Sequence, residues 1–436
     1  MPKSTSWVKT RWLHIPLGVW AIAFVVLVAG GAILSSFVVR RQVAEYPMGH
    51  RFAVRDPAFI SSAHSMADPL PCEGNKIELL NNGDEIFPAM LAAIRSAQKS
   101  INFEAFLYES GTVGTQFREA LRERAKAGVK VRVLLDGVGS GSALKGEDVK
   151  AFRAGGCEFL YYHPTRSWRI DQLNRRTHRR VLVIDGRIGF TGGVGFADQW
   201  QGKADSKDHW RDVHARLEGP IVTRLQSAFQ KHWIKSGGES LSGPEDYPVL
   251  ERAGNLKAQM VASESFSFAP LAHVLSVAFS SAEKSIFITN AYCAPSDSEV
   301  RLLCEAVKRG VKVQLLLPGK HNDQPLTKAA GRTAYGELLE GGVEIFEYTP
   351  TMIHSKTLVI DGIFSIFGTS NFDARSSQIN EEIDITVYDE AFAKMMEAAF
   401  VADVAKSKPY LLEDFKRRGP WERFSEWLML PFHSQM

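Results

Sequence analysis

The chain repeats itself, and this internal duplication limits the possible folds more than any other feature of the sequence. Four short segments recur in the same order roughly 180 residues later. The paired segments are 96–101 and 281–286, 127–135 and 309–317, 155–158 and 341–344, and 178–186 and 354–362. Because four ordered matches are not a chance event, we expect two related lobes, each too incomplete to carry chemistry alone.

Each repeat alternates between two kinds of hydrophobic pattern. Helical spacing of apolar residues is followed each time by a short β-branched run. In the first repeat the expected helices are 87–99 and 117–127, and the expected strands are 101–106 and 129–135. Gly128 and Gly310 stand where a helix should end and a strand begin. The pattern predicts an α/β fold with two pseudo-symmetric lobes, each a mixed sheet flanked by helices.

An apolar run precedes the repeats. From Leu13 to Val39 the only ionisable side chain is His14, and about 20 apolar residues span a bilayer. We therefore expect an N-terminal transmembrane helix in the cell inner membrane, crossing once; a cleaved signal peptide and a buried helix are the alternatives. Basic residues flank the run on both sides, so the side of the membrane that holds the lobes stays open.

The remaining segments complete the predicted organisation. Aromatic and aliphatic residues near the C-terminus predict either a segment at the membrane interface or one that packs on the second lobe. These residues are Trp421, Phe424, Trp427, Leu428, Met429, Leu430 and Phe432. The expected parts are an anchor (1–45), a stalk (46–75), a first lobe (76–240), a linker (241–256), a second lobe (257–418) and a tail (419–436).

Composition excludes several classes of protein. A hydrophobic fraction of 45% excludes wholesale disorder, and a net charge of +3 is too small for a protein that coats polyanions. The four cysteines form no CxxC pair and no cluster with histidines at metal-ligand spacing, so we expect no metal site.

The duplicated segment that carries a histidine is the candidate site. His354 and Lys356 lie two apart at the start of an apolar strand, so they project to the same face. His178 and Arg180 repeat this arrangement in the first lobe. A histidine beside a fixed cation suits phosphate chemistry, because the cation neutralises phosphoryl oxygens while the imidazole attacks phosphorus or transfers a proton.

This doubled pattern, HxKxxxxD followed by a glycine-rich turn, resembles the phospholipase D superfamily. Further first-lobe features are similar to bacterial cardiolipin synthases, and the resemblance covers roughly residues 81 to 415. These features are the run 174–180, the pair Gly192-Gly193, and Trp210-Arg211-Asp212-Val213 leading to Gly219-Pro220.

The resemblance implies a two-step mechanism without metal or other cofactor. One histidine forms a phosphohistidine and the other acts as acid and base; we assign His178 as the nucleophile and His354 as the acid/base, with the reverse order open. An acid downstream of each motif is expected to orient the histidine of the opposite repeat. We therefore expect Asp212 beside His354 and Glu382 beside His178.

The resemblance supplies two sets of candidate residues. The catalytic set is His178, Arg180, Asp185, His354, Lys356, Asp361, Asp212 and Glu382, with both motif aspartates, Asp185 and Asp361, expected to serve mainly in turns. The substrate-binding set is Asn371, Ser370, Gly193, Arg175 and Arg176. Two departures from the family pattern leave open whether activity is weakened: Arg180 replaces a lysine, and Gly195 stands where the second lobe has Asn371. Both histidines and both acids remain, so we do not expect an inactive site.

The first lobe carries an arginine cluster just before its histidine. Its members are Arg166, Arg169, Arg175, Arg176, Arg179 and Arg180, with Trp168 among them. It predicts either a site that gathers anionic headgroups or an ordinary solvated loop.

The resulting functional hypothesis is a membrane-bound phosphatidyltransferase that makes cardiolipin from phosphatidylglycerol. The expected partners are membrane phospholipids (phosphatidylglycerol and cardiolipin) and the lipid bilayer, with no nucleic acid; the sequence does not indicate an oligomeric state. The alternatives are a hydrolytic phospholipase D, a nuclease of the same superfamily, and a lipid-binding scaffold that has lost turnover.

Overall fold

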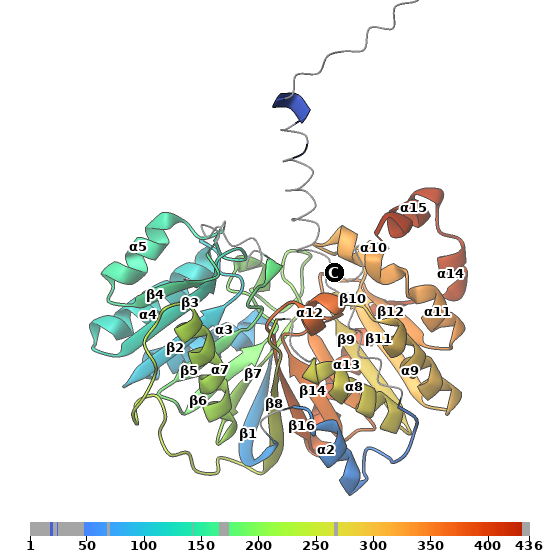
Figure 1. The fold of residues 1–436 in the computed structure, drawn as a ribbon, viewed down its shortest axis with the longest axis horizontal. Helices are drawn as coiled ribbons and strands as arrows, with labels where there is room; N and C mark the ends of the chain where they lie inside the picture. Colours follow the sequence, from blue (N-terminus) through green and yellow to red (C-terminus); the bar gives the residue numbers. More distant parts are fainter. Residues whose placement is uncertain are drawn as a thin grey trace, which may run out of the picture. The chain divides into compact units, whose positions relative to one another are not determined.

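A computed structural model describes residues 18–20, 24, 48–67, 70–141, 143–164, 174–265 and 269–429. From Gln42 onward the chain forms one compact unit, built on a single 15-stranded mixed sheet (Figure 1). This is the α/β architecture that the sequence predicts.

The described residues of the first lobe form seven strands and five helical segments. They are β1 (Cys72–Asn81), α3 (Asn82–Ser96), β2 (Ser100–Ala105), α4 (Thr112–Lys126), β3 (Lys130–Asp136), α5 (Gly146–Ala154), β4 (Glu158–Tyr162), β5 (Val181–Ile184), β6 (Ile188–Gly192), the 3-10 turn η1 (Asp198–Trp200), β7 (Val213–Glu218) and α7 (Ile221–Lys235).

The second lobe repeats this order with small additions. Its elements are β8 (Leu256–Ala262), α8 (Pro270–Ser281), β9 (Ser285–Asn290), β10 (Cys293–Ala294), α9 (Asp297–Lys308), β11 (Lys312–Pro318), α10 (Pro325–Arg332), α11 (Tyr335–Glu340), β12 (Glu344–Tyr348), β13 (Lys356–Ile360), β14 (Phe364–Gly368), β15 (Phe372–Asp373), α12 (Ala374–Gln378), β16 (Ile383–Tyr388), α13 (Glu390–Val404) and β17 (Ser407–Tyr410).

The strand order displays the duplication directly. Outward from the centre, the first lobe runs β1-β7-β6-β5-β2-β3-β4 and the second runs β8-β16-β14-β13-β9-β11-β12, with β17 added at the outer edge. In both lobes the three outermost shared strands are parallel, and the remaining pairs are antiparallel. Antiparallel pairing of β1 with β8 joins the two halves, so the repeats are related by a pseudo-twofold axis at this seam.

Three large clusters of buried apolar residues hold the layers together. One lies under α3 and α4 in the first lobe, and a second lies under α8 and α9 in the second lobe. The third contains residues of α7 and α13 together with strands from both lobes. Because this third core crosses the seam, the two lobes bury apolar surface as one folding unit.

The segment expected as a stalk differs from the prediction. Residues 57–63 form α2 (Pro57–Ala63), whose Phe59 and Ala63 are fully buried in the core of the second lobe. The ring of Phe59 meets that of Phe364 edge-on at 5.1 Å. Spaced apolar residues such as Val54 and Phe59 were too few to reveal this packing in a segment of mixed charge. The strand β1 also begins at Cys72, inside the range expected for the stalk.

The C-terminal residues form two short helices after β17. These are α14 (Leu412–Lys416) and α15 (Pro420–Met429). No helix in the described part of the chain is long and apolar enough to cross a membrane. Most of the apolar run 13–39 lies outside the described residues, as do Leu430 and Phe432 of the tail.

Candidate active site

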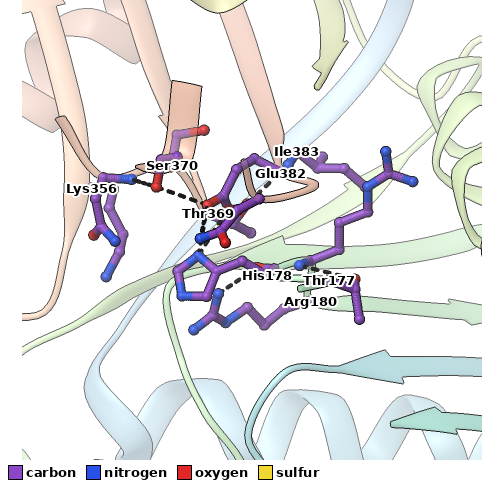
Figure 2. Close-up of polar contacts among 12 residues, drawn as sticks. Thr177, His178, Arg180, Lys356, Thr369, Ser370, Glu382 and Ile383 are labelled. Carbon is purple, nitrogen blue, oxygen red and sulfur yellow. Dashed lines mark hydrogen bonds and ion pairs between the residues drawn. The ribbon is translucent and has the colours of Figure 1, made fainter. Parts of the chain in front are cut away.

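The first-lobe histidine lies just before β5 and meets an acid from the second lobe. Nδ1 of His178 is 2.9 Å from both carboxylate oxygens of Glu382, which precedes β16 (Figure 2). A parallel bridge between Thr177 and Glu381 aligns the two segments, and the amide of His178 donates to the carbonyl of Glu381 at 2.9 Å. The structure therefore brings His178 and Glu382 into contact.

The second-lobe histidine repeats this arrangement with the roles of the lobes exchanged. Nδ1 of His354 lies 2.8 Å from Oδ2 of Asp212, which precedes β7. A parallel bridge joins Arg211 to Ile353, and the amide of His354 donates to the carbonyl of Arg211 at 2.7 Å. Both histidines thus take their acid from the opposite repeat, and all four side chains are buried.

Each histidine has a cation two residues later that folds back onto it. Nζ of Lys356 donates to the carbonyl of His354 at 2.6 Å and lies 3.1 Å from both nitrogens of its ring. The guanidinium of Arg180 donates in the same way to the carbonyl of His178 (Figure 2). Arg180 therefore makes the carbonyl contact that the lysine makes in the other lobe.

The two halves form one electrostatic site. Burial and then the nearby charge of Arg180 lower the pKa of His178 well below its usual range, and Lys356 and His354 add to this effect. Burial and Lys356 lower the pKa of His354 to about 4, against the opposing influence of Asp212. Burial also lowers the pKa of Lys356 to about 7. Each lobe thus contributes charges that act on the other lobe's histidine.

The two acids differ in their electrostatic state. Burial alone would raise the pKa of Asp212, but His354 and Lys356 prevail and lower it to about 2. Burial raises the pKa of Glu382 well above its usual range, although Thr369 donates to it at 2.6 Å and Ser376 at 2.8 Å. Asp212 is therefore the acid that more strongly favours a protonated histidine beside it.

Gly195, which departs from the family pattern in the first lobe, has a steric cause. A Cβ at Gly195 would lie 2.9 Å from the ring of Trp200, so this tryptophan occupies the space of a side chain. The indole Nε1 of Trp200 donates to Oδ2 of Asp212 at 2.9 Å. A Cβ at Gly193 would likewise lie 2.1 Å from Oδ1 of Asp212. Gly193 thus makes room for the acid.

The predicted phosphate donor of the second lobe borders a cavity. This small pocket, which is open to solvent, is lined by Lys356, Ser370 and Asn371 together with apolar side chains of α8. The backbone amide of Asn371 donates to Ser376 at 3.0 Å, and its side-chain Oδ1 is buried without a hydrogen-bond partner. Ser370, in contrast, donates to the carboxylate of Asp384.

The two motif aspartates lie at the far ends of their strands from the histidines. Asp185 and Asp361 each accept three backbone amides from the residues that open β2 and β9, at 2.7 to 2.9 Å. Both adopt positive φ, 51° and 54°, in the turns that follow β5 and β13. Their place in the catalytic set is corrected on this basis: they fix turns and make no contact with either imidazole.

The arginines predicted to bind substrate are only partly described. Nη1 of Arg176 lies 3.2 Å from Oδ1 of the buried Asp136, and the carbonyl of Arg175 accepts from the ring of His163 at 3.1 Å. Arg176 is thus engaged in an ion pair within the first lobe. Arg166, Trp168 and Arg169 lie outside the described residues.

Several residues of the site were not singled out from the sequence. Trp200 and Thr369 hold the two acids, and the ring of Tyr292 lies 5.9 Å from that of His354. Thr369 directly precedes the predicted substrate-binding residues Ser370 and Asn371, which was a usable signal. Trp200 corresponds in the repeat to Ser376, which donates to Glu382 at 2.8 Å, but the two residue types differ. Within the described residues, no group of three or more His, Cys, Asp or Glu side chains is arranged to hold a metal ion.

Several known proteins are similar to this chain over most of its length. Residues 90–233 and 275–404 match the family described as cardiolipin synthase, phospholipase D-like domain. The probable cardiolipin synthase YwiE of Bacillus subtilis is 33% identical over 355 residues, which cover 81% of this chain and 70% of that protein. The minor cardiolipin synthase ClsB of Bacillus subtilis is 32% identical over 353 residues, covering 81% and 87%.

Solved structures show the same fold at lower sequence identity. The crystal structure of phosphatidylserine synthase from Haemophilus influenzae Rd KW20 superposes with a TM-score of 0.66 at 13% identity, covering 85% of this chain and 96% of that chain. The family match covers more than half of the sequence, and the relatives exceed 30% identity over most of their length. This chain therefore belongs to the phospholipase D-like family of cardiolipin synthases.

Proposed function

We propose that this enzyme is a phosphatidyltransferase that makes cardiolipin from two molecules of phosphatidylglycerol through a covalent phosphohistidine. The observation that carries the proposal is the crossed arrangement of the site, in which each histidine is held through Nδ1 by an acid of the opposite repeat. This hydrogen bond orients each imidazole and directs Nε2 away from the acid, toward a substrate.

In the first step, Nε2 of His178 attacks the phosphorus of the donor lipid. A P–N bond forms as the P–O bond to the terminal glycerol breaks, and His354 gives a proton to the departing oxygen. Arg180 and Lys356 offset the negative charge on the phosphoryl oxygens. The products of this step are free glycerol and a phosphatidyl group on His178.

In the second step, the hydroxyl group of a second phosphatidylglycerol is the acceptor. His354, now neutral, removes the hydroxyl proton as the oxygen attacks phosphorus. The P–N bond breaks, which releases cardiolipin and returns both histidines to their starting states. Two steps of this kind replace one difficult displacement, and general acid–base catalysis typically contributes about 10²–10⁴-fold.

The assignment of the two roles rests on the acids. Asp212, with a pKa lowered to about 2, stays ionised and stabilises a proton on His354. The pKa of Glu382 is raised and that of His178 is lowered by burial, which keeps His178 neutral as a nucleophile must be. In the free enzyme the pKa of His354 is about 4, so His354 is neutral there. The negative charge of the bound phosphodiester raises this pKa, and His354 takes up its proton when substrate binds.

We also infer that the enzyme works at a lipid surface, with the apolar run Leu13–Val39 as a single-pass anchor in the inner membrane. Helix α15 adds a second contact. Its acidic residues face the protein, where Glu422 pairs with Arg332 at 3.1 Å and Glu426 pairs with Arg418. Its three aromatic side chains face outward: Trp421 is 76% exposed, Phe424 47% and Trp427 64%.

This orientation is the reverse of a helix that packs on its own protein, where apolar residues face inward. The exposed cations Lys416 and Arg417 precede the aromatic face. Aromatic side chains beside cations suit the interface of a bilayer with anionic headgroups. We therefore assign this face to contact with the lipid.

Product analysis tests the proposal. Purified enzyme incubated with phosphatidylglycerol vesicles should yield cardiolipin and free glycerol in equal amounts, measured by mass spectrometry. Phosphatidic acid as the main product would instead indicate hydrolysis, and cleavage of DNA would indicate a nuclease. Turnover that persists unchanged in both His178→Gln and His354→Gln would refute the mechanism.

The separate roles predict different defects in the two variants. His354→Gln should still form the covalent adduct with a donor whose leaving group needs no proton, whereas His178→Gln should form none. Acid-quenched intact mass spectrometry detects the adduct. An adduct in His178→Gln and none in His354→Gln would show that His354 is the nucleophile and His178 the acid/base.

A further inference from the structure

The residue before each catalytic acid makes a second contact across the two lobes. Arg211 precedes Asp212 and Glu381 precedes Glu382, so the two are equivalent in the repeats. The backbone of each bridges the segment that carries the opposite histidine. Amide-to-carbonyl distances are 2.9 Å from Arg211 to Met352, 2.7 Å from His354 to Arg211, and 2.9 Å both from Glu381 to Arg176 and from His178 to Glu381.

The side chains of these two residues reach a helix of the opposite lobe. Nε of Arg211 lies 2.8 Å from Oδ2 of Asp403 in α13, and both side chains are buried. The carboxylate of Glu381 pairs with Nε2 of His232 in α7, which is fully buried. Nδ1 of His232 lies 2.6 Å from Oε1 of Glu104, so the imidazole lies between two carboxylates.

His232 and Asp403 occupy the same place in their repeats. His232 stands three residues after the pair Ala228-Phe229, and Asp403 stands three residues after Ala399-Phe400. Both lie near the ends of the helices that share the core across the seam, α7 and α13. The two contacts are therefore related by the pseudo-twofold axis, although their residue types differ.

The charges of the two contacts run in opposite directions. The acid-bearing strand carries the cation in the first lobe (Arg211) and the anion in the second (Glu381), while the helix carries the reverse. If two copies of the first lobe were paired by the same symmetry, Arg211 of one copy would face His232 of the other. If two copies of the second lobe were paired in this way, Glu381 of one copy would face Asp403 of the other. Only unlike lobes bring opposite charges together at both places.

We propose that these two cross-lobe ion pairs are positioning devices, which hold each catalytic acid against the histidine of the opposite repeat and accept only the pairing of unlike lobes. The inference rests on the proposed function for the identity of the acids and histidines. A buried pair that loses one partner leaves an uncompensated charge. Its strand then shifts, and the acid one residue away shifts with it.

The test replaces the Arg211–Asp403 pair by the residue types of the Glu381–His232 pair. Arg211→Glu imitates the contact between two second lobes, and Asp403→His imitates the contact between two first lobes. The double variant restores opposite charges in the form that Glu381 and His232 already use. We expect each single variant to lower kcat at least 100-fold with KM changed less than threefold. The double variant should recover at least tenfold over either single variant.

The matched control is a buried ion pair that joins β3 of the first lobe to the linker. Nη1 of Arg132 lies 2.9 Å from Oδ1 of Asp246. Arg132→Glu, Asp246→His and their combination should lower Tm while kcat of the folded enzyme stays within threefold of wild type. All rates are measured well below each variant's Tm. If a variant with reversed charge does not fold, Asp403→Asn is used instead, because it removes the charge and preserves the shape of the side chain. Asp403→Asn should lower kcat about tenfold.

The outcomes separate this inference from the proposed function. Rates are taken both with phosphatidylglycerol and with bis(4-nitrophenyl) phosphate, which needs no lipid acceptor. Wild-type enzyme that cleaves the chromogenic diester but makes no cardiolipin would refute the proposed function, while the charge-exchange test still applies. The positioning role would be overturned if the losses of kcat in the two single variants simply multiplied in the double variant. It would also be overturned if the single variants had a lower Tm but an unchanged kcat.

Discussion

At the scale of single residues, the two halves of the site reach the same geometry with different side chains. The first lobe combines the shorter acid Asp212 with Gly193 and with the indole of Trp200. The second lobe combines the longer acid Glu382 with Thr369, which stands where the first lobe has Gly193. Side-chain length and supporting donors have thus changed together, which keeps both Nδ1 contacts at 2.8 to 2.9 Å.

The arginine in place of a lysine gives a prediction at this scale. Because Lys356 makes in the second lobe the carbonyl contact that Arg180 makes in the first, Arg180→Lys should retain activity within about tenfold of wild type. Arg180→Met removes the charge and should lower kcat by about 10²–10³-fold, as expected for loss of a group that stabilises developing negative charge. Initial rates of cardiolipin formation measure both.

The exposed Arg187 is the control for this pair of variants. It lies in the turn after β5, and Arg187→Met should leave the rate unchanged. Equal rates in Arg180→Met and wild type would show that Arg180 does not act on the phosphoryl group.

At the scale of elements, the strands place the chemistry and the helices fix the strands. The histidines precede β5 and β13, and the acids precede β7 and β16, and bridges between these leading segments join the two lobes. Helix α15 stands apart from this scheme, since its aromatic side chains are largely exposed.

The lipid contact of α15 predicts an effect that depends on how the substrate is presented. The triple variant Trp421→Ser, Phe424→Ser, Trp427→Ser loses the interfacial aromatic face. We expect kcat/KM on phosphatidylglycerol vesicles to fall at least tenfold, while activity on a monomeric short-chain phosphatidylglycerol stays within twofold.

Two exposed apolar residues elsewhere serve as controls. Val401 on α13 is 60% exposed and Val249 is 89% exposed. Val401→Ser with Val249→Ser should change neither activity. If the triple variant loses both activities equally, α15 supports the fold of the second lobe and does not contact lipid.

At the scale of the whole molecule, burial of neutral histidines makes stability depend on pH. Burial lowers the pKa of His64 to about 4, of His214 to about 3 and of His354 to about 4. In the unfolded chain these groups titrate near 6.5, so between about pH 6.5 and pH 4 the unfolded state binds more protons. The free energy of unfolding must therefore fall as the pH falls through this window.

Linkage gives the size of this effect. Between pH 7.5 and pH 5.5 each of the three histidines lowers the free energy of unfolding by about 1.3 kcal/mol. Urea titrations at the two pH values measure the difference. His64→Leu, which removes one such group outside the active site, should reduce the difference by about 1.3 kcal/mol. An unchanged pH dependence in that variant would show that burial of neutral histidines is not the cause.

The sequence by itself determined the features that depend on nearby residues. The apolar runs 181–184 and 357–360 predicted the strands, and the doubled histidine motif located the chemistry. The family pattern also named both acids. Patterns of period 2 and period 3.6 reflect which side of a local element is buried, so they can be read without knowledge of the rest of the fold.

Tertiary structure alone decided the features that depend on contacts between distant segments. The histidines and their acids are separated by 204 and 142 positions, and Trp200, Thr369 and the ion pair of Arg211 with Asp403 leave no periodic trace in the chain. The packing of α2 on the second lobe was likewise missed, since Phe59 lies in a segment without sustained periodicity. Such contacts arise from how two lobes close around a shared seam, and this closure is a property of packed surfaces, which local sequence patterns do not record.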